Sequence, residues 1–482
     1  MSVVLSMGAS QLARLIRTGR LSSLEVVEAH IARIEAVNPM INALTEARFE
    51  KALVEAERVD EQLRAHPKRR SWPALFGVPF SVKEYIGVLG MRQTGGILSR
   101  RSHRAASDAS TVRRLRRAGA IVLGTTNGPE GGLSMETHNL IYGRTSNPWN
   151  LAHTAGGSSG GEGALIAAGG TPFGLGADIG GSIRIPAAFC GICGHKPTGG
   201  IIPTTGHYPP ASGASGAFLT IGPMARRVED LRVVTQILLG PDGRDRSCTR
   251  TIDADMARSA LSAVTVYPMT ELGGLRLDAH LADAIQHAAI VLNEAGAEIR
   301  YRAVEHLDKG FEIWMGALEE TATETYETIL GQGERIDHLR TLLAVPFGRA
   351  EHTLPALVVS AAEKLAGRLP PLLKRYGALA STLQAELEAM LGSTGVMLYP
   401  VYPRSAPKHY RALVRPRLTG CTSLFNILEF PATVVPIGTD PLGLPLALQV
   451  IGARGQDALT LSVAEHLERR LGGWTLAEPK GR

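Results

Sequence analysis

The chain has 482 residues, of which 44% are hydrophobic and 20% charged, a composition typical of a globular protein that buries a large core. Its formal net charge of +6 is small for this length. We interpret the basic clusters at 68–70 and 113–117 as a solvated loop and a solvated helix face, so no nucleic acid partner is expected. No window approaches about 18 uninterrupted apolar residues, so we expect no transmembrane segment.

The four cysteines are too few for a disulfide framework in a chain of this length. Cys190 and Cys193 form a lone C-x-x-C pair, with no second pair to complete a zinc site. We therefore expect buried free thiols, no metal and no cofactor. The first residues, Met1–Ala9, lack the basic region and apolar run of a secretory signal, which favours a reducing, cytoplasmic compartment.

The first predicted helix begins at Ser22, because Ser22 and Glu25 have the spacing of a capping box. Apolar residues at 27, 31 and 34 fall on one face of it, and Asn38-Pro39 is expected to end it. The next predicted element is the mostly apolar run Gly77–Lys83, which is typical of a buried strand and ends on a lysine.

A helix, a glycine stop and a buried strand are predicted in that order for Asp108–Arg117, Gly119 and Ala120–Leu123. The same pattern recurs later as a helix over Ala279–Ala295 and a strand over Glu298–Tyr301. Such alternation of helices and short apolar strands predicts a layered α/β fold.

Two serines, Ser158 and Ser182, lie 24 positions apart in glycine-rich turns with the sequences GGSSGG and DIGGSIR. Such turns let the backbone approach a ligand and leave N–H groups unpaired. Between them, Glu162–Ala168 predicts a short helix and Phe173–Ala177 a strand. This turn–helix–strand–turn arrangement can bring both serines to one edge of a sheet.

The second half of the chain contains a helical stretch, 307–391, in which Thr353–Leu369 is notably apolar. The elements predicted after it are strands at Val396–Tyr399, Ala432–Val435 and Leu446–Ile451 and a helix at Ala458–Leu471.

Acyl transfer at a carbonyl group needs a nucleophile, a proton donor for the leaving group and stabilisation of the oxyanion. Ser182 provides a hydroxyl, and the N–H groups of Ile179, Gly180 and Gly181 can converge on the carbonyl oxygen. Burial lowers the pKa of a lysine, so Lys83 can act as a base near neutral pH. Taken singly, a lysine at a strand end is more often solvated or paired with a neighbouring glutamate, and serines beside glycines are more often plain turn residues.

The stretch Gly156–Thr198 resembles the signature region of the amidase signature family, and Gly77–Lys83 resembles its lysine motif. The resemblance extends over nearly the whole chain. It implies one domain, 1–482, folded as an α/β/α sandwich around a large mixed β-sheet. It also implies that the helical segment 307–391 forms a wall or lid of the substrate channel; the alternative is ordinary helical packing on the sheet.

The resemblance further implies the role of each site residue. Ser182 matches the nucleophile, Ser158 the bridging serine that follows a cis peptide bond, and Lys83 the general base of a Ser-cisSer-Lys triad. The supporting residues that it implies are Ser159, Asp178 and Arg184.

Within the family, His138–Arg144 and Gly194–Pro197 are most similar to the fatty-acid amide hydrolase branch, particularly its second type. This implies a small-molecule substrate, a hydrophobic or long-acyl amide, cleaved through an acyl-enzyme. It also implies a homodimer. Any contact with a membrane is expected to be peripheral.

Two alternatives stay open. Gly156–Gly160 satisfies the G-x-S-x-G pattern, in which Ser158 would be the nucleophile of an α/β-hydrolase. That turn must follow a strand directly, and residues 147–155 predict none. The other alternative is the amidase component of a tRNA-dependent amidotransferase complex, although Ile185 stands where those components typically carry glutamine.

Overall fold

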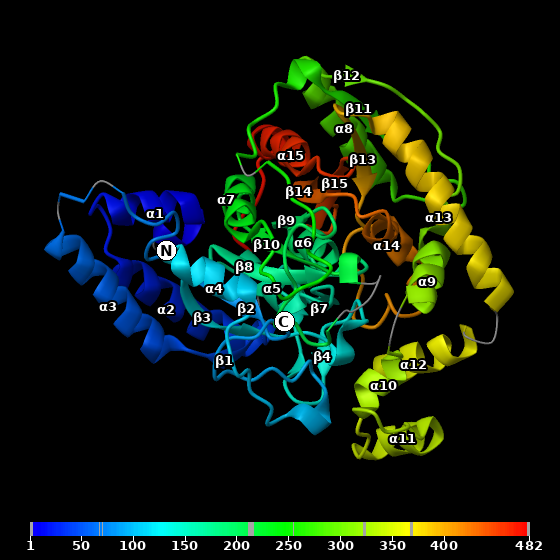
Figure 1. Ribbon diagram of the computed structural model, residues 1–482, viewed down its shortest axis with the longest axis horizontal. Helices are drawn as coiled ribbons and strands as arrows, with labels where there is room; N and C mark the ends of the chain where they lie inside the picture. The colour runs from blue at the N-terminus through cyan, green and yellow to red at the C-terminus, as the bar shows by residue number, and fades with distance from the viewer. Residues whose placement is uncertain are drawn as a thin grey trace.

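A large mixed β-sheet runs through the molecule (Figure 1). The computed structural model describes residues 3–66, 68–69, 71–210, 216–253, 255–321, 324–366 and 370–479. The strands of this sheet are β1 (Leu44–Ala47), β2 (Pro79–Lys83), β3 (Ile121–Thr126), β8 (Phe173–Asp178), β9 (Cys193–Lys196), β10 (Thr220–Ala225), β11 (Thr265–Pro268), β12 (Glu298–Ile299), β13 (Gly395–Pro400), β14 (Ala432–Thr439) and β15 (Pro445–Ile451).

Within the described residues the sheet has eleven strands, in the order β1-β3-β2-β8-β10-β9-β14-β15-β13-β11-β12. Strands β3, β2 and β8 are parallel to one another, as are β13, β11 and β12. In the run β8-β10-β9-β14-β15-β13, each strand is antiparallel to its neighbour. Because β2 and β8 run in the same direction, Lys83 at the end of β2 and the turn after β8 lie at the same edge of the sheet.

Helices cover both faces of the sheet. On β9, the His195 side chain contacts Asp457 of α15 (Asp457–Leu471) at 3.2 Å. The adjacent Gly194 faces the opposite way, where a Cβ atom would lie 2.9 Å from Ala187 of α6 (Arg184–Cys190). Since neighbouring strand residues point to opposite faces, α6 and α15 lie on opposite faces. The predicted α/β/α sandwich is confirmed.

Two more helices complete the layers beside them. On the face of α6 lies α5 (Gly160–Ala167), where Gly163 packs against Pro186. On the face of α15 lies α7 (Val228–Leu238), and Val228 N–H donates to Glu468 of α15 at 2.9 Å. Helix α8 (Ala279–Glu294) and strand β12 reproduce the predicted helix–glycine–strand unit.

The N-terminal helices are α1 (Ala9–Arg17), α2 (Ser23–Ile41), α3 (Phe49–Ala65) and α4 (Ser110–Arg117). The predicted capping box is confirmed, with Ser22 at the N-cap of α2 accepting from Glu25 N–H at 3.0 Å. The predicted end at Asn38-Pro39 is wrong, because α2 continues to Ile41. Proline removes one hydrogen bond from the helix, whereas the last turn buries Ile41 completely.

Two of the four arginines of α4 contact partners elsewhere in the protein. Arg114 donates to the carbonyl oxygens of Leu238 and Leu239 at the end of α7. Arg116 pairs with Glu55 at 3.1 Å. The cluster 113–117 does lie on a helix, but the prediction of a solvated face is only partly right, because Arg114 and Arg116 are half-buried whereas Arg117 is exposed. Within the other cluster, 68–70, residue 70 lies outside the described residues.

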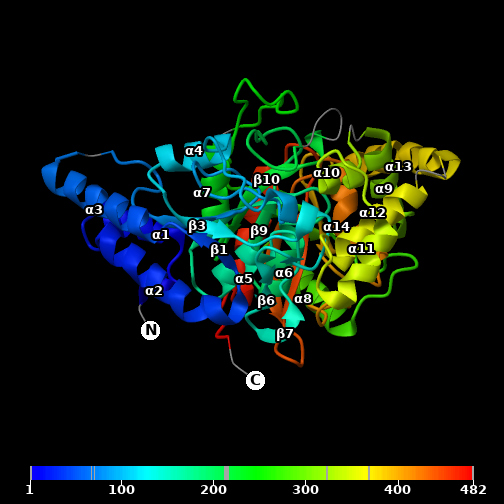
Figure 2. The same cartoon turned by 90° about the horizontal axis from the view of Figure 1, so that it is seen from below.

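All the regular elements in the described residues of the segment 307–391 are helices, and the segment lies at the end of the molecule opposite α1–α3 (Figure 2). Its elements are η6 (Leu307–Lys309), α9 (Gly310–Thr321), α10 (Tyr326–Gly331), α11 (His338–Ala344), η7 (Val345–Phe347), α12 (Leu354–Ala366) and α13 (Pro370–Leu391). The last three residues of the apolar stretch, 367–369, lie outside the described residues. The role of this segment in the substrate channel stays a prediction.

The prediction that residues 147–155 contain no strand is wrong. Residues Asn150–Thr154 form β7, which pairs antiparallel with β6 (Ser146–Asn147) in a small sheet of its own. The sequence there has no apolar run; β7 is held instead by pairing with β6 and by Thr154 N–H, which donates to Pro407 O at 3.0 Å. A second two-stranded sheet is formed by β4 (His138–Asn139) and β5 (Gly143–Arg144).

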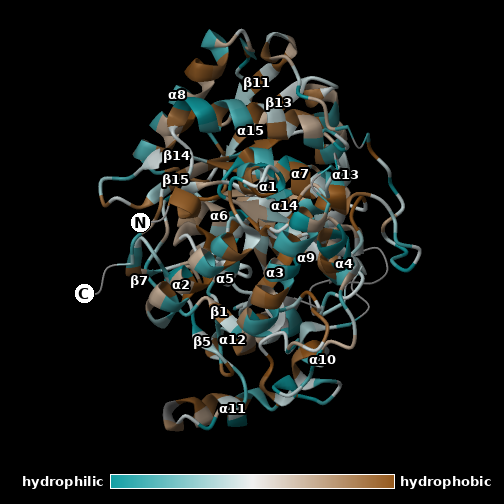
Figure 3. Ribbon diagram, turned by 90° about the vertical axis from the view of Figure 1, so that its left-hand side faces the viewer, coloured by the Kyte–Doolittle hydropathy of each residue, from teal (hydrophilic) through white to brown (hydrophobic). Residues whose placement is uncertain are grey.

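The remaining elements are short. They are η1 (Val3–Ser6), η2 (Leu98–Arg100), η3 (Glu130–Gly132), η5 (Leu261–Ala263), η8 (Pro416–Thr419) and α14 (Gly420–Ile427). Hydrophobic and hydrophilic residues alternate around the helices (Figure 3), and no helix of the described chain is long and apolar enough to cross a membrane. All four cysteines are free and buried, as predicted.

Candidate active site

Lys83 lies at the carboxyl end of β2, a strand whose five residues are all buried. The lysine side chain is 1% exposed, and its Nζ donates a hydrogen bond of 2.6 Å to Ser158 Oγ. The Nζ also lies 4.5 Å from the centre of the Tyr85 ring. Glu84, the adjacent glutamate, accepts hydrogen bonds from Thr94 N–H and Oγ1 at 2.5 and 2.6 Å rather than from the lysine.

Ser158 lies between β7 and α5, in the first glycine-rich turn, and is 3% exposed. The Gly157–Ser158 peptide bond is cis, as the resemblance implied. A Cβ atom on Gly157 would collide with the carbonyl oxygen of Ser134, so only glycine fits there. The next residue, Ser159, joins the turn to β8 through contacts of its Oγ with Ala177 N and O at 3.3 and 3.4 Å.

The second glycine-rich turn, which carries Ser182, lies directly against the first. Ser159 N–H donates to Ser182 O at 3.0 Å. Ser182 is only partly buried, and within the described chain its hydroxyl has no hydrogen-bond partner. The structure thus brings Lys83, Ser158 and Ser182 together at one edge of the sheet, the lysine innermost and Ser182 nearest the solvent.

A buried ion pair holds the second turn. The Arg184 guanidinium makes two hydrogen bonds of 3.0 Å to the Asp178 carboxylate, and both side chains are completely buried. Asp178 also accepts from Gly181 N–H at 2.7 Å and from Ile183 N–H at 3.1 Å. Although burial alone would raise the pKa of Asp178, the Arg184 guanidinium holds it well below its usual range.

The remaining guanidinium donors reach the C-terminal part of the chain. Arg184 donates to Thr422 O at 2.9 Å, to Gln449 Oε1 at 3.0 Å and to Asn426 Oδ1 at 2.5 Å. Asn426 in turn donates to the Asp178 carboxylate at 2.9 Å. The turn is therefore fixed from α14 and β15 as well as from within.

These hydrogen bonds decide which N–H groups of the turn face outward. Gly181, with φ of 122°, gives its N–H to Asp178, so that N–H shapes the turn and is not available to the carbonyl oxygen, contrary to the prediction. In the described part of the chain the N–H groups of Ile179, Gly180 and Ser182 meet no acceptor. Ile179, Gly180 and Ser182 are also the partly exposed residues of the turn.

Burial dominates the electrostatics around Lys83. It lowers the pKa of the lysine to about 7, against the opposing effect of the Asp178, Glu162 and Glu84 carboxylates. Burial also raises the pKa of Glu162 to about 8, against its hydrogen bonds from Ser81 and Thr126. Near pH 7 a substantial fraction of Lys83 is thus uncharged and able to accept a proton.

The geometry does not support the α/β-hydrolase alternative. A strand does precede Ser158, but β7 belongs to a separate two-stranded sheet. The partner of Ser158 Oγ is a lysine and not a histidine. His207, which lies beside Tyr85 and is hydrogen-bonded to Pro209 O, has its pKa lowered to about 3 by burial and by Lys83.

The family follows from comparison with known proteins. The amidase family model matches residues 25–461. The chain belongs to the amidase family. It is 38% identical over 488 residues to fatty-acid amide hydrolase 2-B of Danio rerio, covering 98% of this chain and 90% of that protein.

Two further relatives show the breadth of the family. A glutamyl-tRNA(Gln) amidotransferase subunit of Synechococcus sp. (strain CC9605) is 29% identical, covering 94% of each chain. A solved structure of 6-aminohexanoate cyclic dimer hydrolase superimposes with a TM-score of 0.79, at 28% identity and over 99% of each chain. This amidase is accordingly an amide-hydrolysing enzyme of the amidase signature type.

Sequence reasoning missed three residues that hold the site of this amidase. Trp314 donates to Ile179 O at 2.8 Å, and Thr422 Oγ1 donates to Gly180 O at 2.8 Å. Asn426, described above, is the third. Asn426 lies in a stretch that shares the family resemblance, but Trp314 is in the helical segment where no motif marks it.

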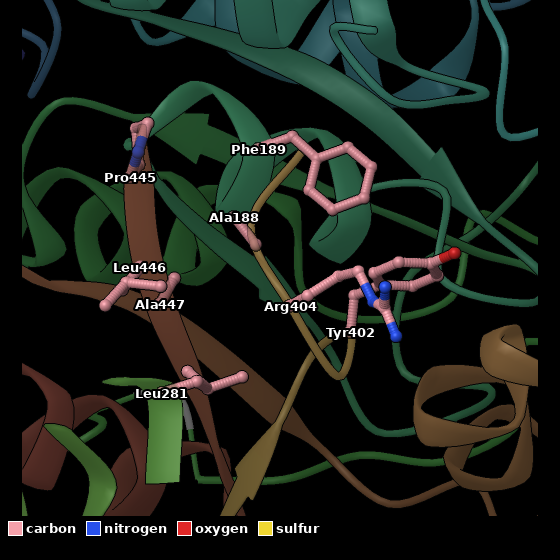
Figure 4. A pocket seen from close by; sticks show the side chains of 8 residues that line it. All are labelled: Ala188, Phe189, Leu281, Tyr402, Arg404, Pro445, Leu446 and Ala447. Atoms are coloured by element: carbon pink, nitrogen blue, oxygen red, sulfur yellow. The ribbon is translucent and has the colours of Figure 1, made fainter. Parts of the chain in front are cut away.

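A small cavity lies away from this site, between α6 and β15 (Figure 4). It has a volume of about 10 Å³, about the size of one water molecule. Its lining includes Phe189, Tyr402 and Arg404 and none of the site residues named above. We assign it no role in catalysis.

Arg184→Met is expected to lower the free energy of unfolding by about 3–5 kcal/mol, because it leaves the Asp178 carboxylate buried without its partner. Arg258→Met is a matched control: Arg258 pairs with Glu465 at 2.8 Å but is 56% exposed, and such a pair contributes about 0–1 kcal/mol. Urea denaturation of both variants measures the difference. Equal losses in the two would contradict the importance of the buried pair.

Proposed function

We propose that this amidase hydrolyses hydrophobic, long-acyl amides through an acyl-enzyme on Ser182, with Ser158 and Lys83 as the proton relay. The observation that carries the proposal is the 2.6 Å hydrogen bond from the buried Lys83 to Ser158, within a turn that touches the Ser182 turn. No metal or cofactor takes part in the proposed steps.

Acylation begins when Ser182 Oγ bonds to the carbonyl carbon of the amide. The Ser182 proton passes to Ser158 Oγ while the Ser158 proton passes to Lys83 Nζ. The tetrahedral intermediate then collapses by breaking the C–N bond, and the leaving amine takes its proton from Lys83 through Ser158. The products of this step are the free amine and an ester on Ser182.

Deacylation repeats the same transfers with water. A water molecule attacks the ester carbon, and its proton passes through Ser158 to Lys83. The C–O bond to Ser182 breaks, Ser182 Oγ regains a proton through the relay, and the carboxylic acid leaves. In both halves the negative oxygen is stabilised by the outward N–H groups of Ile179, Gly180 and Ser182, which are fixed before the reaction starts.

The substrate class rests on the relatives and on the surroundings of the site. The 38% identity to a fatty-acid amide hydrolase supports a long acyl chain. The half-buried indole of Trp314 lies against Gly180 of the second turn, where Cζ2 would be 3.2 Å from a Cβ atom, and so forms an apolar wall beside Ser182. Apolar walls of this kind favour a hydrophobic acyl group.

The alternative is the amidase component of a tRNA-dependent amidotransferase, the class of the Synechococcus relative. Ile185 follows the nucleophile turn in this chain and is buried in α6, where those components typically have glutamine. The higher identity to fatty-acid amide hydrolase 2-B favours a free-standing hydrolase.

The expected homodimer, peripheral membrane contact and cytoplasmic compartment stay predictions. One feature supports contact with an apolar surface: several large apolar side chains of α11, η7 and α12 are 48–76% exposed. They are Leu339, Leu342, Leu343, Phe347, Leu354 and Val358. Exposed apolar side chains grouped in this way often mark an interaction site.

Ser182→Ala is expected to reduce kcat by at least about 10³-fold, because no nucleophile remains. Ser158→Ala and Lys83→Met should reduce it severely, because the proton relay is broken. Ser102→Ala, at an exposed position, serves as the control and should leave kcat unchanged.

A fluorophosphonate should modify Ser182 in the wild-type protein, as mapped by peptide mass spectrometry. An adduct on Ser158 instead would contradict the assignment.

The value of kcat/KM is expected to fall about tenfold per pH unit as the pH drops below about 7. The sign follows from the role of Lys83, which accepts a proton only when uncharged and is protonated below its pKa of about 7. Steady-state rates and the rate of fluorophosphonate labelling should show the same acid limb. A flat profile between about pH 5 and pH 9 would remove Lys83 from the base role.

The purified chain alone is expected to hydrolyse a long-acyl amide such as an oleoyl amide, with kcat/KM at least about tenfold above that for the acetyl analogue. Each buried methylene contributes about 0.8 kcal/mol, so even two well-buried groups supply this factor. A panel of acyl-chain lengths measures the preference. Activity that appears only with added partner proteins would favour the amidotransferase alternative.

A further inference from the structure

The peptide group between Ile179 and Gly180 is held from outside the turn. Trp314 Nε1–H, on α9, donates to the Ile179 carbonyl oxygen at 2.8 Å. The next carbonyl oxygen, that of Gly180, accepts from Thr422 Oγ1 at 2.8 Å. Two consecutive carbonyl groups of the turn are therefore fixed by side chains from the C-terminal half of the chain.

Fixing a carbonyl group also fixes an N–H group. A trans peptide is planar, and its C=O and N–H bonds point in opposite directions. The hydrogen bond from Trp314 therefore sets the direction of the Gly180 N–H, which meets no acceptor among the described residues. The hydrogen bond from Thr422 sets the direction of the Gly181 N–H, which donates to Asp178.

The indole is packed closely against the same peptide. A Cβ atom on Gly180 would lie 3.2 Å from Cζ2 of Trp314, closer than an ordinary van der Waals contact. The tryptophan itself is half-buried, and the Phe311 ring lies beside it at 6.0 Å between ring centres. The indole thus has little freedom to rotate away from the turn.

Helix α9 is anchored where it begins. Gly310 packs against the backbone of Gly420 in α14 so closely that a Cβ atom would collide with the Gly420 carbonyl oxygen. Ser423 Oγ donates to Gly310 O at 3.5 Å. Since Thr422 belongs to the same α14, both carbonyl groups of the turn are held by one packed pair of helices.

We propose that Trp314 is a positioning residue for the amide-hydrolysis reaction: by holding the Ile179 carbonyl group it aims the Gly180 N–H at the oxyanion. This inference rests on the proposed function, in which that N–H stabilises the negative oxygen. The oxyanion exists only in the transition state and the tetrahedral intermediate, so a loosened donor lowers kcat without weakening substrate binding.

Trp314→Phe tests the inference, since phenylalanine keeps an aromatic ring but has no N–H. Loss of a whole oxyanion donor reduces kcat about 10²–10³-fold, so a donor that is present but less well oriented should reduce it about 10-fold to 10²-fold. The value of KM for a long-acyl amide should stay within about twofold. Trp314→Met, whose flexible apolar chain fills irregular space and has no N–H or O–H donor, carries the same expectation if the phenylalanine variant fails to fold.

Trp149→Phe is a matched control. Trp149 is also half-buried, and its Nε1–H donates to the Cys190 carbonyl oxygen at 2.8 Å. This hydrogen bond does not involve either of the two serine turns. It should lose comparable thermal stability with kcat unchanged. Equal kcat losses in Trp314→Phe and Trp149→Phe, or a rise in KM alone for Trp314→Phe, would overturn the inference.

A trifluoromethyl ketone with the same acyl chain gives a second measurement, because it forms a negatively charged adduct with the nucleophilic serine. Its Ki should rise in Trp314→Phe by the same factor as kcat/KM falls. An unchanged Ki in an active enzyme overturns this inference alone. Full turnover by Ser182→Ala would overturn the proposed function and the inference with it.

Discussion

The buried ion pair between Asp178 and Arg184 is the interaction on which the arrangement of the site depends. The Asp178 carboxylate accepts from two backbone N–H groups of the turn, those of Gly181 and Ile183. Arg184 extends the same network to Gln449 of β15. A desolvated carboxylate must have all these partners to be stable, so the turn has one geometry in the folded protein. The position of Ser182 follows from that requirement.

A second constraint is the burial of Lys83, which is 1% exposed. The same burial that lowers the lysine pKa to about 7 raises the pKa of Glu162 to about 8. Each of these groups favours the charged form of the other, whereas desolvation disfavours both charges. The hydrogen bond from Lys83 to Ser158 extends from this buried pair toward the turn that carries the partly exposed Ser182. The proposed relay thus runs from the core outward.

Much of the fold could be predicted because local signals agreed with packing. The capping box at Ser22 and the helix–glycine–strand unit around Gly119 are decided by neighbours in sequence. The errors arose where distant contacts prevailed over local preference. Burial of Ile41 carries α2 past Pro39, and pairing with β6 makes a strand of Asn150–Thr154. The turn motifs located the two serines, but the engagement of the Gly181 N–H and the hydrogen bond from Trp314 depend on three-dimensional packing, which no local motif encodes.

The reach of α9 back to the nucleophile turn has a consequence for how this enzyme can change. The segment 307–391 is predicted to line the substrate channel, and on that prediction substitutions there alter which acyl groups are accepted. Because α9 also supports the Ile179 carbonyl group, such substitutions would disturb the reaction rate as well. A substitution in this segment that changes the preference for acyl groups would therefore also change kcat, in evolution as in protein engineering. A variant library built on this segment would explore both at once unless position 314 were held constant.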